Sequence, residues 1–209
     1  MNPARLCTLF IAAAVLARGA FADSPEAPTS ANLILNGTFA STLESWTTAS
    51  GQVLAEWSPE NSSTDGTGSA RLTSFSPNSG EQVSVLSQCV AITSGAYLLQ
   101  LALRVPSGQS STGTGRASAA AYANTVCSGS ALAPAAFTPA ISASSWANDW
   151  IAVNVPAGAA SLRIALLVLK SQAGGELEVL ADAVQLRSGL LFADGFASGT
   201  TAQWSAVVP

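Results

Sequence analysis

The sequence predicts an all-β protein, a β-sandwich of about 8–9 antiparallel strands. Short apolar or alternating runs follow one another along the chain, and clusters of glycine, proline, asparagine and serine separate them. This succession is typical of sandwiches and barrels whose strands are joined by tight turns. The expected strands are 33–35, 52–57, 70–75, 82–92, 97–105, 116–126, 150–155, 162–169 and 177–186.

The alternation is clearest in the expected strand 97–105, where a tyrosine, three leucines and a valine occupy every second position. Successive side chains of a strand point to opposite faces, so this apolar row faces the core. Gln100 and Arg104 then share the outer or concave face. In the strand 162–169 both rows are largely apolar, which predicts a central strand covered on both sides.

Two segments are less regular. The segment 116–126 is rich in alanine, which strands disfavour, so a short helix is the alternative there. Its place between two turn clusters favours the strand. The segment 131–146 is rich in alanine, proline and serine, and it predicts a long loop with at most a helical turn.

The first residues have the features of a secretory signal peptide. Arg5 precedes the apolar run 6–17, which is too short to span a bilayer, and Ala20-Phe21-Ala22 fits the cleavage pattern. We expect a signal peptide over 1–22, a linker over 23–31, the sandwich over 32–188 and a C-terminal tail over 189–209. The mature chain would then be a secreted bacterial protein, periplasmic or extracellular, without a transmembrane segment.

The composition excludes several function classes. The net charge is −4, whereas nucleic-acid binding needs a basic surface. The absence of histidine removes Ser-His-Asp and Cys-His catalysis and the commonest zinc ligand. One carboxylate pair remains, because Glu176 and Glu178 share a strand face at roughly 7 Å. We interpret the pair as a solvated strand edge that discourages further pairing, and we expect no enzyme.

Cys89 and Cys127 remain after removal of the signal peptide, which carries Cys7. An even number of cysteines in an exported chain predicts a disulfide, whereas a metal site would need more ligands than two thiols. The loop between them is long enough for roughly 4 kcal/mol of stabilisation in the loop-entropy model.

Three pieces of the sequence carry a resemblance to a known family. They are NLILNGTF at 32–39 with Trp46, Trp150 before a strand that ends in VPAG at 155–158, and LADAVQL at 180–186. Together they resemble carbohydrate-binding modules of the family 4 and 9 type and the wider galactose-binding-like jelly rolls. The resemblance spans the expected sandwich and implies a jelly roll in which Trp46 and Trp150 pack in the core.

The resemblance also implies a structural calcium ion between the N-terminal turn and the last strand. The candidate ligands are Asn36, Gly37 and Asp182. The acid that the family places after the phenylalanine is replaced by Ala40, which removes an oxygen ligand and counts against the ion. No other cofactor is expected.

A sugar ring packs its C–H face on an aromatic side chain, while amides, carboxylates and arginines bind its hydroxyls. The candidate platforms are Trp57 before a polar loop, Trp146 in an irregular segment and Tyr122 among alanines. The candidate polar groups are Gln100 and Arg104, for which a solvated face is the alternative.

These observations predict a non-catalytic secreted carbohydrate-binding module with a polysaccharide or other glycan as its partner. The alternative is an extracellular structural or adhesive protein that uses the same sandwich for protein or matrix contacts. Low aromatic content favours this alternative, as does the tail LLFADGFASGTTAQWS at 190–205, which offers a place for a protein partner. Exposure of Trp57, Trp146 and Tyr122 on one concave surface would favour the glycan binder.

Overall fold

The computed structural model describes residues 31–62 and 68–188. The expected signal peptide, all but the last residue of the expected linker and the expected C-terminal tail lie outside these ranges. Those predictions, and the proposed protein partner of the tail, therefore stay predictions. Within the described ranges, no helix is long and apolar enough to cross a membrane.

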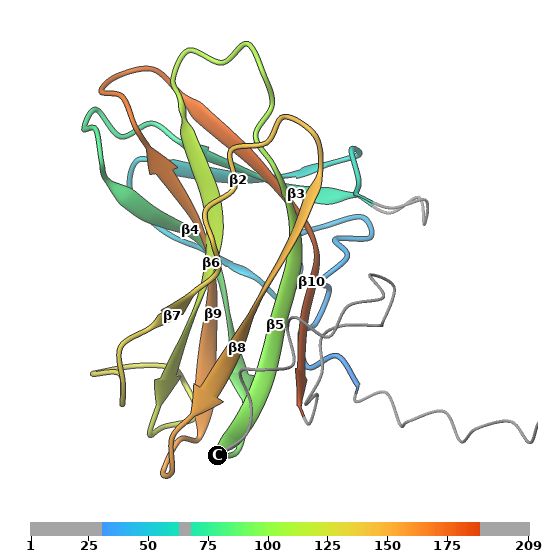
Figure 1. Cartoon of the computed structure of the whole chain (residues 1–209), viewed down its shortest axis with the longest axis vertical. Coiled ribbons are helices and arrows are strands. Elements are labelled where there is room, and N and C mark those ends of the chain that lie inside the picture. Colours follow the sequence, from blue (N-terminus) through green and yellow to red (C-terminus); the bar gives the residue numbers. More distant parts are fainter. Residues whose placement is uncertain (1–30, 63–67, 189–209) are drawn as a thin grey trace, which may run out of the picture.

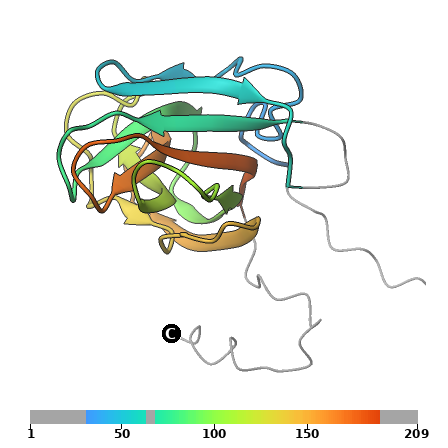
Figure 2. The same ribbon diagram turned by 90° about the horizontal axis from the view of Figure 1, so that it is seen from above.

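Two antiparallel five-stranded sheets pack against each other, which confirms the predicted β-sandwich (Figure 1, Figure 2). The first sheet has the order β1 (Thr47–Thr48), β4 (Gln82–Ala91), β9 (Ser161–Lys170), β6 (Gly113–Tyr122) and β7 (Ala136–Phe137). The second sheet has the order β2 (Val53–Ser58), β3 (Ser69–Ser74), β10 (Leu177–Ser188), β5 (Gly95–Arg104) and β8 (Ala147–Val155).

The core lies between the inner faces of the two sheets. The predicted alternation in β5 is confirmed, because Leu99, Leu101 and Leu103 are buried in the core while Gln100 is exposed. The prediction for β9 is confirmed as well. This strand is the middle one of the first sheet, and Leu167 on its outer row is only 5% exposed.

The alanine-rich segment forms the strand β6, as predicted, and not the short helix that propensity alone allows. A Cβ atom added to Gly115 would lie 2.4 Å from Cγ1 of Val179 in the opposite sheet, closer than atoms can pack. Ala117, Ala119 and Ala121 continue this inner row and are buried. Small side chains therefore let the two sheets approach here, and this packing overrides the weak strand propensity of alanine.

Two expectations about the elements are wrong. Residues 33–35 form no strand, because Asn32 Oδ1 accepts hydrogen bonds from the N–H groups of Ile34 and Leu186 and thereby bends this segment against β10. The segment 131–146 is not a loop throughout; it contributes β7, and Ile141 forms a bridge with Gly115. This segment thus extends the first sheet instead of forming a free loop.

The predicted disulfide between Cys89 and Cys127 is confirmed, with a Cα–Cα distance of 5.8 Å. It joins β4 to the turn after β6 on the first sheet. Trp46 is buried as expected, and its ring centroid lies 5.5 Å from that of Phe39.

Candidate functional site

The outer face of the second sheet carries a transverse row of one aromatic and two amide side chains. Trp150 of β8 pairs with Gln100 of β5, and Gln100 pairs with Gln185 of β10. Directly opposite residues of neighbouring strands have Cβ atoms about 4.5–5.5 Å apart. The three side chains, which we name the Trp150 row, therefore form one continuous surface.

Trp150 is 43% exposed, so the expectation that it packs in the core is wrong. Val153 and Val155 of the same strand are 4% and 5% exposed and face the core. Because side chains alternate along a strand, positions 151, 153 and 155 face inward and position 150 faces outward. The indole is thereby an accessible flat apolar surface at the edge of the sheet.

Gln100 is exposed, as predicted, and Gln185 is partly buried. The side-chain oxygen of Gln185 accepts a hydrogen bond from Arg187 Nε at 3.1 Å. Each amide offers both donors and acceptors, which suits groups that also donate and accept. Apolar contact on Trp150 is thus combined with two-way hydrogen bonding beside it.

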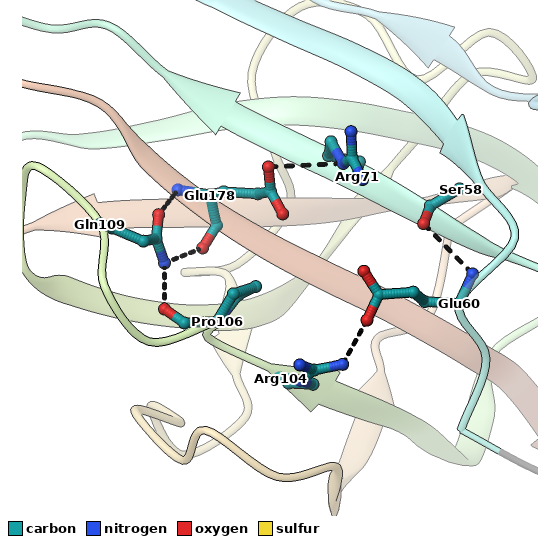
Figure 3. A network of polar contacts seen from close by, with 7 residues as sticks. All are labelled: Ser58, Glu60, Arg71, Arg104, Pro106, Gln109 and Glu178. Atoms are coloured by element: carbon teal, nitrogen blue, oxygen red, sulfur yellow. Dashed lines mark hydrogen bonds and ion pairs between the residues drawn. The ribbon is translucent and has the colours of Figure 1, made fainter.

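Arg104 also lies on this outer face, but its guanidinium is engaged by protein groups. It donates from Nε to the carbonyl of Ser144 at 3.0 Å and forms an ion pair with Glu60 (Figure 3). Glu60 belongs to the segment after β2, so this ion pair spans the width of β3 and β10. Arg104 therefore fixes a loop in place, and a direct ligand role stays a prediction.

We name residues 58–62 the strap. Its far end is held by Asp182, whose Oδ2 accepts hydrogen bonds from the Ser62 backbone N–H and hydroxyl, both at 2.8 Å. Asp182 is 1% exposed and the outward Leu180 is fully buried, although both lie on the outer face of β10. The middle of the outer face is therefore covered, and the strap separates the Trp150 row from the surface over β2 and β3.

On the other side of the strap lies a pocket of about 310 Å³ over β2, β3 and β10. Its walls include Leu54, Glu56, Arg71, Phe75 and Glu178, and the loop between β5 and β6 closes one side. Sequence reasoning did not identify this pocket, because strands that are distant in sequence build it.

The interpretation of Glu176 and Glu178 as a solvated strand edge is wrong. β10 is the middle strand of its sheet, flanked by β3 and β5, and Glu176 lies just before it. Glu178 forms an ion pair with Arg71, in which Nε and Oε2 are 3.3 Å apart. The two acids thus line the pocket wall instead of protecting an edge.

The three aromatic candidates do not share one surface, so the arrangement of Trp57, Trp146 and Tyr122 that would favour a glycan binder is not found. Tyr122 is 2% exposed and belongs to the first sheet, where the Arg163 guanidinium lies 5.1 Å from its ring centroid. Trp146 is partly buried and directly precedes Ala147, which pairs with Leu103, so it lies at the edge of the second sheet near Arg104.

Trp57 is 39% exposed but lies at the edge of the sandwich, on the side of β2 that faces away from Glu56. Its indole N–H donates to the carbonyl of Phe39 at 2.8 Å, and its ring occupies the space beside Gly68. This packing closes the edge of the core. The role of these aromatics in ligand binding stays a prediction.

The candidate calcium ligands are already bonded to protein groups. Asn36 Oδ1 accepts from the Ala40 N–H, and the Gly37 carbonyl accepts from the Val184 N–H at 2.8 Å. Asp182 Oδ1 accepts from the Ala183 N–H, while Oδ2 is held by Ser62. These oxygens therefore fit a calcium site poorly, because they already accept hydrogen bonds from the protein and a calcium ion needs several oxygen ligands. Calcium binding stays a prediction.

Among residues 31–62 and 68–188, no three histidine, cysteine or acidic side chains lie close enough together to hold a metal ion.

Asp149 directly precedes Trp150 in β8, on the opposite face of the strand, and the pKa of its carboxyl is perturbed. Burial raises its pKa above the usual range, although a hydrogen bond from the Trp150 N–H at 2.8 Å opposes the shift. Protonation therefore favours the folded state. This contribution is fully present below the pKa of the unfolded chain and is lost as the pH rises through the folded-state pKa.

An Asp149→Asn variant removes this titration and keeps an acceptor for the Trp150 N–H. We expect the variant to be more stable than the parent at neutral pH, with the difference shrinking toward about pH 4, near the ordinary pKa of aspartate. Thermal unfolding over a pH series measures it. A difference that does not change with pH would contradict the prediction.

Comparison with known proteins establishes the fold. No protein-family model matches the sequence, and a search of the curated proteins found no match. Among solved structures, the family 16 carbohydrate-binding module-2 superposes with a TM-score of 0.52 at 16% identity, covering 74% of this chain and 99% of that one. The C-terminal family 22 carbohydrate-binding module of Clostridium thermocellum Xyn10B superposes with a TM-score of 0.53 at 11% identity, covering 76% and 94%.

A third structure is the enzymatically active domain of bacteriophage CBA120 tailspike protein 4, with a TM-score of 0.56 and 19% identity. The match covers 76% of this chain but 21% of the tailspike chain. At these identities the likeness establishes the jelly-roll β-sandwich, and structural neighbours of this fold are carbohydrate-binding modules. The narrower resemblance to the family 4 and 9 type stays a prediction.

Proposed function

We propose that the protein binds a glycan on the Trp150 row, without catalysis and after export from the cell. The observation that carries this proposal is the exposed Trp150 ring beside the amides of Gln100 and Gln185. The ring packs against the C–H face of a sugar, and the amides exchange hydrogen bonds with its hydroxyls.

Three further features support the proposal. The jelly-roll fold is one that carbohydrate-binding modules use, although fold alone does not fix function. The chain has no histidine, and the carboxylate of Glu178 is paired with Arg71, which favours a binding role over a catalytic one. The apolar run and cleavage pattern at the N-terminus favour export.

The test is retention of the protein on a panel of insoluble and soluble polysaccharides, with a Trp150→Ala variant alongside. Truncating a central aromatic contact typically costs about 2 kcal/mol or more, so we expect at least a roughly 30-fold loss of affinity for the retained glycan. Phe137→Ala is the matched control, because Phe137 is 38% exposed on the first sheet.

Two outcomes would contradict the proposal. One is a folded, disulfide-bonded protein that no glycan retains. The other is retention that Trp150→Ala leaves unchanged. Either result would favour the alternative, in which the sandwich makes structural or adhesive contacts with protein or matrix.

A further inference from the structure

The pocket over β2, β3 and β10 is a preformed concave site that the Trp150 row does not include. Its volume of about 310 Å³ lies at the lower end of the range for small-molecule sites, which suits a mono- or disaccharide better than a long chain segment. The strap lies between the two places. A ligand in this pocket would therefore be bound separately from one on the Trp150 row.

The pocket offers an apolar surface of its own. Leu54 and Phe75 line it and are 40% and 39% exposed, although both are large hydrophobic side chains. Leu54 lies near the start of β2, and Phe75 directly follows the last residue of the neighbouring strand β3. An aromatic ring with an aliphatic neighbour, both open to solvent inside a concavity, matches the C–H face of a sugar.

The opposite wall of the pocket is held in place by Gln109 (Figure 3). Its amide donates from Nε2 to the Glu178 carbonyl at 2.9 Å and to the Pro106 carbonyl at 2.7 Å, and its oxygen accepts from the Glu178 N–H. Next to it, the Ser110 hydroxyl accepts from the Glu176 N–H at 2.9 Å. The loop is thereby fixed against β10 before any ligand arrives, which lowers the cost of binding.

The charges around the pocket are unbalanced. Its lining contains three carboxylates, those of Glu56, Glu176 and Glu178, and one cation, Arg71. The ion pair between Arg71 and Glu178 accounts for one carboxylate. Within the described residues the other two have no cationic partner. A ligand that carries a positive charge would complete the pairing.

We propose that this pocket is a second binding site that takes an amino sugar, a pyranose bearing a protonated amine. Leu54 and Phe75 contact the ring, and the negative charges of the Glu56 and Glu176 carboxylates in the pocket lining attract the ammonium group. This inference rests on the proposed function, because it assigns a sugar class to a pocket beside the glycan-binding row.

Isothermal titration of the purified protein with glucosamine oligosaccharides and with N-acetylglucosamine oligosaccharides of the same length tests the proposal. The acetylated sugars lack the charge. Exposed ion pairs contribute up to about 1 kcal/mol, so we expect the amine form to bind about fivefold more tightly in low salt. High salt should remove most of that preference.

A Glu56→Gln/Glu176→Gln double variant should abolish the preference for the amine form. Both side chains are exposed, so the double variant should keep the fold. Glu44→Gln is the matched control, since Glu44 is an exposed acid outside the pocket.

Equal affinity for the two sugar forms would overturn the proposal, as would a preference that the double variant retains. Tight binding of calcium alone that the double variant loses would overturn it as well.

The two proposals fail separately. Trp150→Ala should reduce the retention of neutral glycans and leave the preference for the amine form intact. If Trp150→Ala has no effect on neutral glycans, the proposed function fails, whereas an amine preference independent of Glu56 and Glu176 removes only the second site.

Discussion

An Asp182→Ala variant is expected to be less stable than the parent by about 3 kcal/mol, because a buried charged acceptor disappears. The carboxylate is 1% exposed and accepts hydrogen bonds from the Ser62 N–H, the Ser62 hydroxyl and the Ala183 N–H. Without it, these donors either stay buried and unpaired or the strap lifts from the outer face. Urea unfolding, followed by tryptophan fluorescence, measures the change.

The contact that Glu60, in the middle of the strap, makes with Arg104 provides the control. Glu60→Gln breaks the ion pair with Arg104, whose side chains are 44% and 29% exposed, and such partly exposed pairs contribute about 1 kcal/mol or less. We therefore expect the two variants to differ clearly, although both loosen the same segment. An Asp182→Ala variant within about 0.5 kcal/mol of the parent would contradict the role of Asp182, since that is the range of ordinary surface changes.

The difference between the two contacts explains how the outer face is organised. Asp182 holds the strap at Ser62 through a buried carboxylate, and Arg104 holds it at Glu60 through a partly exposed ion pair, so the strap is more firmly anchored at β10 than at β5. Leu180, which pairs with Arg104 between these two contacts, is fully buried. The strap is therefore the part of the face that sets how far a ligand on the Trp150 row can extend toward the pocket.

The strands could be predicted because their signal is local. Leu99, Leu101 and Leu103 alternate with polar or small residues, and that period alone indicates a strand with one face buried. The disulfide followed from cysteine number and expected export. The two-residue strands β1 and β7 had no such signal, since two residues carry no period and only their partners in β4 and β6 define them.

The candidate site was predicted only in part. Gln100 was placed on the outer face correctly, since its own strand carries the alternation. The prediction for Trp150 is wrong because it rests on the family resemblance and not on the alternation of side chains along the strand. Val153 and Val155 face inward, so position 150 faces outward. Gln185 is not among the predicted site residues, because an irregularity in β10 between Asp182 and Gln185 changes which residues face outward.

The pocket could not be predicted from the sequence at all. Its ion pair joins Arg71 to Glu178, more than a hundred residues apart, and depends on β3 lying beside β10. Strand order in a sandwich is set by the packing of the whole sheet, so no local pattern reports it. The same reason explains why Glu178 was expected on an edge and lies on the middle strand.

The Cys89→Ser/Cys127→Ser double variant is expected to lose about 4 kcal/mol of stability, the largest single effect we predict. The bridge closes a loop with a sequence separation of 38 residues. That loop contains all of β5 and β6, which belong to different sheets. Without the bridge, the unfolded chain regains the freedom that this loop had lost, and folding becomes less favourable by that amount. Urea unfolding of the oxidised parent, the reduced parent and the double variant measures the effect.

The reduced parent and the double variant should unfold at the same denaturant concentration, and reductant should not affect the variant. Glycan retention under native conditions should be unchanged, because Cys89 and Cys127 lie on the first sheet while the Trp150 row lies on the second. A stability loss below about 1 kcal/mol would contradict the loop-entropy argument and indicate that the unfolded chain stays confined without the bridge. Loss of glycan retention in a variant that remains folded would instead show that the first sheet takes part in binding.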